Sequence, residues 1–303
     1  DRVKELGQTA IAITDHGVMY GCIDFYKAAK AAGIKPIIGC EVYVAPRSRF
    51  DKEHGVDSEY THLILLCKNE TGYKNLCYLV SMAFTEGFYI KPRIDWALLH
   101  EHAKGLICLS GCVAGAIPRM INAGNYEGAK KKALELSELF GKDGFYLEIQ
   151  DHGLEAEKRA AEGLLRIHRE TGIPLAVTND AHYVEKDDAY YQDVLMCVQM
   201  QKTMHHVPEK FSENRFSEFR SLPDSGIKAD DDLSYSVSMR KSNDIRRRRI
   251  IQKTGMHIPD DVIGNHADFY FIQSGKYGDR AFRQRQHGRK TTLQGSNQGI
   301  RNG

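Results

Sequence analysis

Six short apolar runs, separated by stretches with a helical pattern, occupy the first two-thirds of this chain. We expect strands at residues 9–14, 36–45, 62–67, 105–110, 145–150 and 174–178. The runs are nearly continuous in apolar residues rather than alternating, which is typical of strands buried on both faces. Repeated strand–helix units predict an α/β fold with a parallel sheet, either closed as a barrel or open.

Helical patterns lie between these runs. We expect helices at residues 18–32, 125–140, 154–171 and 185–200. Asn125 stands where an N-cap is expected, and Gly33, Gly141 and Gly172 stand just beyond expected helix ends. These residue types are the common caps at the two ends of a helix.

Composition narrows the class of protein further. The chain has 303 residues, 42% of them hydrophobic, and a formal net charge of +2. It contains no run of 18 apolar residues, so we expect no membrane partner, and its near-neutral charge argues against a strongly basic nucleic-acid binder. All 7 cysteines lie before residue 204, and an odd number without a tight framework indicates reduced thiols and a cytoplasmic location. The chain starts at Asp1 without an initiator methionine, which we interpret as the start of a fragment.

The last third differs from the rest. We expect one domain over residues 1–203 and an atypical basic tail over residues 204–303. The tail has no sustained hydrophobic period, is rich in Gly, Ser, Gln and Arg, and contains four consecutive arginines at 246–249. Three interpretations are open: a poorly ordered tail, a basic nucleic-acid-binding arm, or a shifted reading frame from about residue 204.

Residues that can ligate metals recur at the ends of the expected strands. In parallel α/β sheets, ligands gather at the carboxyl ends of the strands. The candidates are Asp15, His16, Glu41, His62, Cys112, Asp180 and His182. Carboxylates and imidazoles suit Zn²⁺, Mn²⁺ or Fe, and a thiolate adds softness. Each residue alone has an ordinary alternative as a turn, strand-edge, capping or core residue, so the prediction depends on the recurrence.

The spacing of two pairs of these candidates constrains the direction of their side chains. Asp180 and His182 are two apart, so on an extended segment both side chains point to the same side. Asp15 and His16 are adjacent and can share one site only if the strand breaks into a turn, which Gly17 permits. Four other histidines (His100, His102, His152 and His168) lie in helix or loop positions and are expected at the surface.

A site with several metal ions is suited to phosphate esters, because metals bridge phosphate oxygens and acidify bound water. Lys91, Arg93 and Arg119 could bind the phosphate, with ordinary surface charge as the alternative. Beyond the metal ligands we predict no catalytic residue. The chain lacks both the G-x-x-x-x-G-K-[ST] loop and the G-x-S-x-G motif, which disfavours P-loop nucleotide hydrolysis and serine-esterase chemistry.

At these residues a resemblance becomes specific. The chain contains AIAITDHGVMYGCIDFYKAAKAAGIKPIIGCEVYVAP, HLILLCKNETGYKNLCYLVS, YIKPRID, LSGCVAGAIP, FYLEIQDHG and VTNDAHYV. These segments closely resemble the polymerase-and-histidinol-phosphatase (PHP) domain at the N-terminus of bacterial DNA polymerase III alpha subunits. The resemblance covers about residues 1–203.

The resemblance implies a distorted (βα)7 TIM-like barrel of the PHP type with a trinuclear metal centre. By this analogy the seven candidate ligands match seven of nine family positions. The family's opening His-x-His strand would lie upstream of Asp1, so this chain is expected to lack the first strand and two ligands, and not to form the complete centre alone. The intact domain would hold two or three divalent ions (Zn, Mn or Fe).

The same resemblance implies the activity and the partners. The parent protein would be a DNA-directed DNA polymerase in DNA replication, with a Mg-dependent polymerase site outside this chain. The PHP domain itself would be a metal-dependent 3′→5′ exonuclease or phosphoesterase. Implied partners are DNA and, through absent parts, the sliding clamp and clamp loader. Two alternatives stay open: a free-standing phosphoesterase of the histidinol-phosphatase type, and a catalytically silent structural PHP domain.

Overall fold

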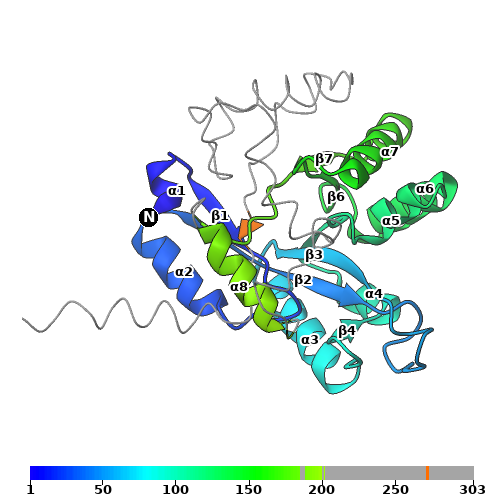
Figure 1. Ribbon diagram of the computed structural model, residues 1–303, viewed down its shortest axis with the longest axis horizontal. Helices are drawn as coiled ribbons and strands as arrows, with labels where there is room; N and C mark the ends of the chain where they lie inside the picture. Colours follow the sequence, from blue (N-terminus) through cyan, green and yellow to red (C-terminus); the bar gives the residue numbers. More distant parts are fainter. Residues whose placement is uncertain (185–187, 200, 202–270, 273–303) are drawn as a thin grey trace, which may run out of the picture.

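The structure is a computed structural model that describes residues 1–184, 188–199, 201 and 271–272. Helices and strands mostly alternate along the chain (Figure 1). In chain order the elements are α1 (Arg2–Glu5), β1 (Ala10–Ile13), α2 (Cys22–Ala31), β2 (Lys35–Val44), β3 (Thr61–Cys67), α3 (Glu70–Thr85), β4 (Arg93–Ile94), α4 (Trp96–His102), β5 (Leu106–Leu109), α5 (Ala116–Asn122), α6 (Tyr126–Phe140), β6 (Phe145–Ile149), α7 (Glu155–Thr171), β7 (Leu175–Val177), α8 (Ala189–Gln199) and β8 (Phe271–Ile272).

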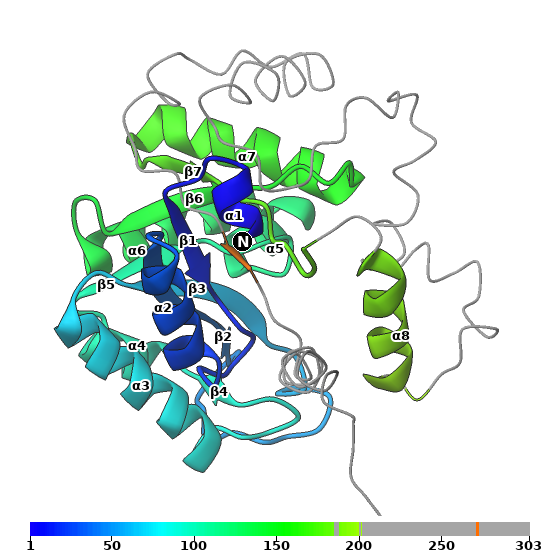
Figure 2. The same cartoon turned by 90° about the vertical axis from the view of Figure 1, so that its left-hand side faces the viewer.

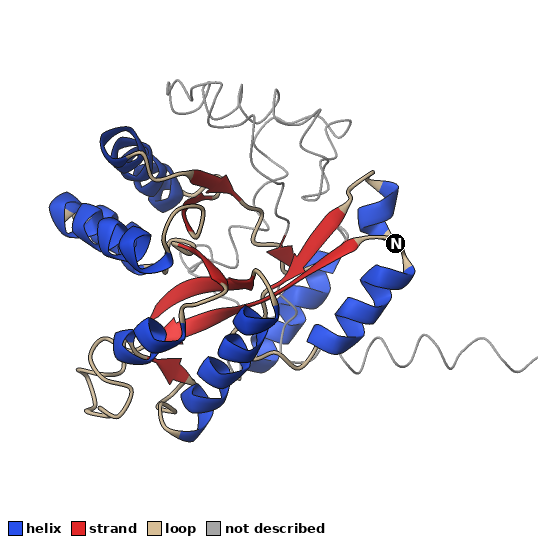
Figure 3. Ribbon diagram, turned by 180° about the vertical axis from the view of Figure 1, so that it is seen from behind, coloured by secondary structure: helices blue, strands red, loops and turns tan. Residues whose placement is uncertain are grey.

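The strands form one curled sheet with helices on its outer side (Figures 2 and 3). Its strand order is β7-β6-β5-β3-β2-β1-β8, and β4 pairs with β2 beside this path. All six expected strands are present within one or two residues of their predicted bounds. The α/β class and the barrel-like curl are therefore confirmed.

The expectation of a wholly parallel sheet is wrong at one strand. β3 runs antiparallel to both β2 and β5, whereas β1 with β2, β5 with β6, and β6 with β7 are parallel. Residues 45–60, which join β2 to β3, contain no helix, so the chain turns back beside β2 without a crossover. As a result β3 begins at the edge of the sheet where β2 ends.

The two faces of the sheet pack differently. Cys40, Val42 and Val44 of β2 and Leu63 and Leu65 of β3 belong to the main core, packed against helices that include α3, α6 and α7. The other face of these strands carries a smaller apolar cluster that includes Ile37, Ile64 and Leu66. Because side chains alternate along a strand, Glu41, Tyr43 and His62 lie on this inner face, beyond its apolar cluster.

Two expected helices match closely because their caps are local. Asn125 accepts a hydrogen bond from the Gly128 amide at the start of α6, and Gly172 ends α7 in a left-handed conformation. The helix expected at 18–32 begins only at residue 22, after an irregular segment. Of the helix expected at 185–200, α8 covers Ala189–Gln199, and 185–187 and 200 lie outside the described residues.

The predicted tail lies almost wholly outside the described residues, so its expected disorder and the boundary at residue 203 stay predictions. The exception is β8, whose Phe271 and Ile272 pair in parallel with Ala12 and Ile13 of β1. None of the helices in the described part of the chain is long and apolar enough to cross a membrane.

Candidate metal centre

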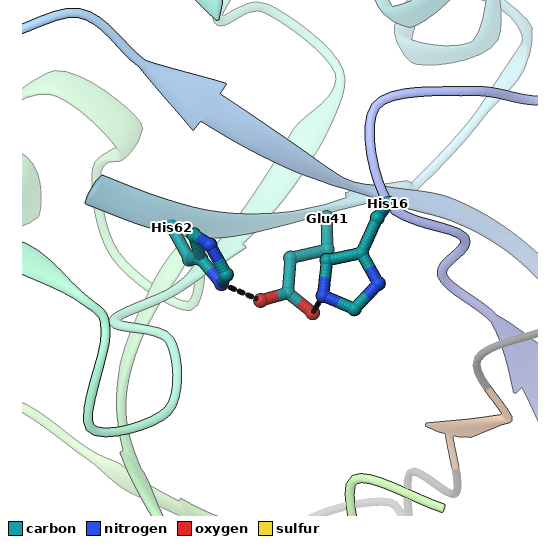
Figure 4. A group of neighbouring side chains, drawn as sticks. All are labelled: His16, Glu41 and His62. Carbon is teal, nitrogen blue, oxygen red and sulfur yellow. Dashed lines mark hydrogen bonds and ion pairs between the residues drawn. The ribbon is translucent and has the colours of Figure 1, made fainter. Parts of the chain in front are cut away.

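Three of the predicted ligands converge on the inner face of the sheet (Figure 4). Glu41 Oε1 lies 2.5 Å from His62 Nδ1, and Glu41 Oε2 lies 3.5 Å from His16 Nε2. One ligand atom from each residue can be chosen so that all three lie within 4.8 Å of one another. Two imidazoles around one carboxylate are a donor set that suits Zn²⁺, Mn²⁺ or Fe.

Strand pairing explains this convergence. Glu41 on β2 faces Ile64 on β3, and His62 pairs with Tyr43, so Glu41 and His62 lie on one face and two positions apart along the ladder. His16 joins through a parallel bridge to Glu41 beyond the end of β1. Gly17 then turns the chain at a φ of +65°, and a Cβ there would lie 2.9 Å from the Tyr43 ring.

The surroundings of His16 favour its neutral form. Burial lowers the pKa of His16 below its usual 6.5, and this effect outweighs the opposing attraction of the Glu41 carboxylate. The neighbouring His62 and His182 lower the pKa of His16 further. At neutral pH the imidazole is therefore uncharged, which is the form that binds metals.

Cys112 lies beside the three-residue group. Its Sγ is 4.0 Å from His62 Nδ1 and 3.5 Å from the Ala114 amide nitrogen. The loop approaches closely because Gly111 has a φ of +82° and a Cβ there would lie 2.9 Å from the His62 carbonyl oxygen. The loop after β5 thus carries a thiol to the same edge as His62.

Asp180 and His182 reach this edge from the end of β7. The His182 ring centroid is 6.0 Å from that of His16, and His182 Nδ1 lies 2.9 Å from the Asp180 carbonyl oxygen. Asp180 has a φ of +48°, so the chain turns there rather than staying extended. The negative charge of Asp180 acts on His16 and on Glu148.

Asp15 is placed differently from its neighbour. It is buried, and one carboxylate oxygen lies 3.5 Å from the position that a Cβ on Gly21 would occupy. Its backbone carbonyl accepts hydrogen bonds from the Glu41 amide and the Cys40 thiol. Adjacent side chains on an extended segment point to opposite sides, so His16 enters the three-residue group and Asp15 does not.

The three predicted phosphate-binding residues have separate surroundings. The Lys91 ammonium lies 5.6 Å from the ring centroid of Tyr43, which neighbours His16. Arg119 forms an exposed ion pair with Glu59 at 3.3 Å. Arg93 is fully buried, and its guanidinium donates to the carbonyl oxygens of Gly87, Asp57 and Asp51. We attribute a structural role to Arg93, because its donors tie the loop between β2 and β3 to the turn after α3.

The expectation that His152 is a surface residue is wrong. His152 is buried; its Nδ1 lies 2.6 Å from Glu157 Oε1, and its Nε2 lies 2.7 Å from the Asn179 carbonyl oxygen. Burial opposes protonation of His152, but Glu157, Asp180 and the Asn179 carbonyl together outweigh it, so the net pKa is raised. With acceptors at both ring nitrogens, the His152 side chain holds the loop that leads to Asp180. The sequence pattern did not predict the burial of His152, because its contacts with Glu157 and Asn179 form only in the folded chain.

Glu148 is a second buried group that the pattern did not single out. It lies in the middle of β6, where the sequence reads as an apolar strand. Its Oε1 accepts hydrogen bonds from Thr178 and Gln150, while Oε2 has no hydrogen-bond partner among the described residues. Glu148, Gln150 and Cys112 line a cavity of about 10 Å³, roughly the space for one water molecule.

Replacing Glu148 by glutamine is expected to remove a pH-dependent loss of stability from the metal-free chain. Burial raises the pKa of Glu148 from 4.5 to about 8, so between these values the folded chain keeps a proton that the unfolded chain has released. The free energy of unfolding of the wild type therefore falls as the pH rises through this window, by roughly 2–5 kcal/mol. Glutamine is uncharged throughout and lacks this fall.

Urea unfolding with EDTA at pH 5 and pH 9 measures the difference. Glu162→Gln, at an exposed position of α7, is the control and should keep the wild-type slope. Equal pH dependence of the wild type and Glu148→Gln would contradict the prediction.

The inner face of the curled α/β sheet carries two histidines, a glutamate and a nearby thiol. The fold and these residues together define a class of barrel-like α/β proteins with a candidate metal centre inside the sheet. A family model described as the PHP domain matches residues 1–152, half of the chain. The chain belongs to the PHP domain family.

Relatives with names extend the comparison. DNA polymerase III subunit alpha of Treponema pallidum is 52% identical over 200 residues, covering 66% of this chain and 17% of that protein. The Borreliella burgdorferi subunit is 48% identical over 198 residues, covering 65% of this chain and 17% of that protein. The Thermus aquaticus subunit is 47% identical over 204 residues, covering 67% of this chain and 17% of that protein. The match thus spans 17% of the length of these relatives.

Among solved structures, a predicted metal-dependent phosphoesterase of Bifidobacterium adolescentis matches with a TM-score of 0.36 and 14% identity. The match covers 58% of this chain and 78% of that chain.

Proposed function

We propose that this chain is the PHP-domain part of a replicative DNA polymerase III alpha subunit and that the domain hydrolyses phosphodiester bonds at DNA 3′ ends with the help of divalent metal ions. The observation that carries the chemistry is the group of His16, Glu41 and His62 within 4.8 Å. The relatives at 47–52% identity support the polymerase branch of the family. A cytoplasmic location and assembly with a sliding clamp and clamp loader belong to the same proposal.

His16, Glu41 and His62 would hold one ion. Cys112 near His62, His182 near His16, and Asp180, whose charge acts on His16, would extend the site. Asp15 stays a predicted ligand that the three-residue group does not include. The identity of the ions (Zn²⁺, Mn²⁺ or Fe) is part of the proposal. Bound divalent ions would supply acidified water and charge stabilisation for phosphate ester hydrolysis. Lys91, beside the ring of Tyr43, would attract the phosphate.

The test is release of nucleotides from a 3′-labelled single-stranded oligonucleotide, with Mn²⁺ or Zn²⁺ added. It should be run on this chain and on the polypeptide encoded by the complete surrounding reading frame, which tests the expected upstream His-x-His strand. From the polypeptide of the complete reading frame we expect release of the labelled 3′ nucleotide, which EDTA and His62→Ala abolish and which His100→Ala, on an exposed face of α4, leaves unchanged.

Other outcomes decide between the alternatives. Metal binding without hydrolysis by the complete polypeptide would favour a structural PHP domain. Hydrolysis of small phosphate monoesters without release from DNA would favour a phosphatase. Nucleotide release that survives His62→Ala would contradict the proposed site.

A further inference from the structure

Two tyrosines adjoin the candidate metal centre. The Tyr60 ring is parallel to that of His62, with an interplanar angle of 2° and centroids 5.9 Å apart. The Tyr43 ring meets Tyr60 edge to face at 5.0 Å and His62 at 5.2 Å. Tyr43 also stacks on His16, with centroids 6.0 Å apart. The two tyrosines therefore form an aromatic wall along the histidine pair.

The backbone fixes this wall. Tyr43 is the direct partner of His62 across the antiparallel β2–β3 ladder, so the two side chains lie on the same face. Tyr60 precedes His62 by two residues on the approach to β3, which gives it the same side. Tyr43 is buried, whereas Tyr60 is partly exposed.

The ammonium group of Lys91 lies next to this aromatic wall. Lys91 lies 5.6 Å from the centroid of Tyr43 and is partly exposed. Its backbone exchanges hydrogen bonds with that of Tyr89 across a tight turn in which Ile90 has a φ of +63°. This turn directs Lys91 to the aromatic side of the centre.

We propose that Tyr60, supported by Tyr43, forms a subsite that stacks a nucleobase of single-stranded DNA, and that Lys91 pairs with a phosphate of the same strand. The proposal rests on the proposed function, because it assigns the substrate's base to a surface next to the metal-binding group. Aromatic side chains beside a backbone-binding cation are the usual components of single-strand recognition. A phosphate ester without a base would gain nothing from Tyr60, so the wall selects nucleotides over small phosphate monoesters.

The test compares two fluorescent twelve-nucleotide strands, oligothymidine and its abasic analogue, by anisotropy in EDTA. Wild-type chain is expected to bind oligothymidine at least about 5-fold more tightly than the abasic strand. Tyr60→Leu should weaken binding of oligothymidine by about 5- to 100-fold and leave the abasic strand unaffected, while Tyr60→Phe keeps the ring and the affinity. Lys91→Ala should weaken both strands and reduce the salt dependence by about one phosphate contact. Tyr26→Leu, at an exposed position of α2, is the matched control.

Equal wild-type affinity for both strands, or no binding of either, would overturn the proposal without recourse to any variant. Equal losses on both strands in Tyr60→Leu would also overturn it, because they would make Tyr60 a structural residue. Base-dependent binding without nucleotide release would support the subsite and contradict the nuclease function. Nucleotide release without base-dependent binding would support the nuclease function and contradict the subsite.

Discussion

A chain with Glu41→Ala is expected to bind Mn²⁺ and Zn²⁺ about 100-fold or more weakly than the wild type. Glu41 supplies the only negative charge in its group with His16 and His62, and its two oxygens face the two imidazoles. Loss of a residue that merely orients a metal ligand lowers affinity by about 10- to 100-fold, and loss of a ligand should reach or exceed that range. Competition with a chromophoric chelator measures the affinity directly.

Glu59→Ala is the control for this substitution. Glu59 is a carboxylate at the surface, paired with the exposed Arg119, and its removal should leave metal affinity unchanged. Urea unfolding in EDTA shows whether Glu41→Ala remains folded. A folded Glu41→Ala chain with wild-type affinity would refute the assignment of these three residues as a metal site.

Gly72→Ala is expected to destabilise the chain by about 3 kcal/mol, although alanine has the higher helix propensity. Gly72 lies in the first turn of α3, and a Cβ there would lie 1.8 Å from the carbonyl oxygen of Gly105. Asn69, the N-cap of α3, accepts a hydrogen bond from the Gly72 amide and lies against Gly105 as well. Because the atoms that a Cβ would meet here belong to the backbone, a methyl group can be accommodated only if α3 moves away from the turn before β5.

Gly124→Ala separates this packing effect from backbone strain. Gly124 has a φ of +77°, but no atom of the described part of the chain lies within 4 Å of the position that a Cβ would occupy, so its substitution should destabilise by only about 1–2 kcal/mol. Urea unfolding of both variants in EDTA gives the comparison. A Gly72→Ala loss no larger than that of Gly124→Ala would show that α3 shifts freely.

Local patterns were sufficient for the strands and for the capped helices. Strands buried on both faces read as apolar runs whatever their partners, and Asn125 and Gly172 act within one turn of their own helices. The pattern did not single out α3, α4 and α5 as helices. α3 and α4 do have local caps, at Asn69 and Asp95, so their first turns carried a signal that could have been used.

The candidate site divides in the same way. Residue type and position in or next to the expected strands selected His16, Glu41 and His62. Strand alternation and pairing placed Glu41 and His62 on one face. Sequence could not separate Asp15 from His16, because the direction of each side chain depends on the bridge between His16 and Glu41. Nor could it recognise Tyr60 and Tyr43 as neighbours of the histidines, since Tyr43 meets His62 only through the register of β2 and β3.

The sequence by itself determined the α/β class, the strands and the ligand types, because these depend on hydrophobic runs, caps and residue chemistry along a short stretch of chain. Only the tertiary structure decided that β3 runs antiparallel, which brings His62 to the edge where β2 ends. It also buried Arg93, His152 and Glu148 with partners far away in the chain. Strand direction and buried polar contacts depend on which distant segments meet, and a pattern read along one chain does not contain that information.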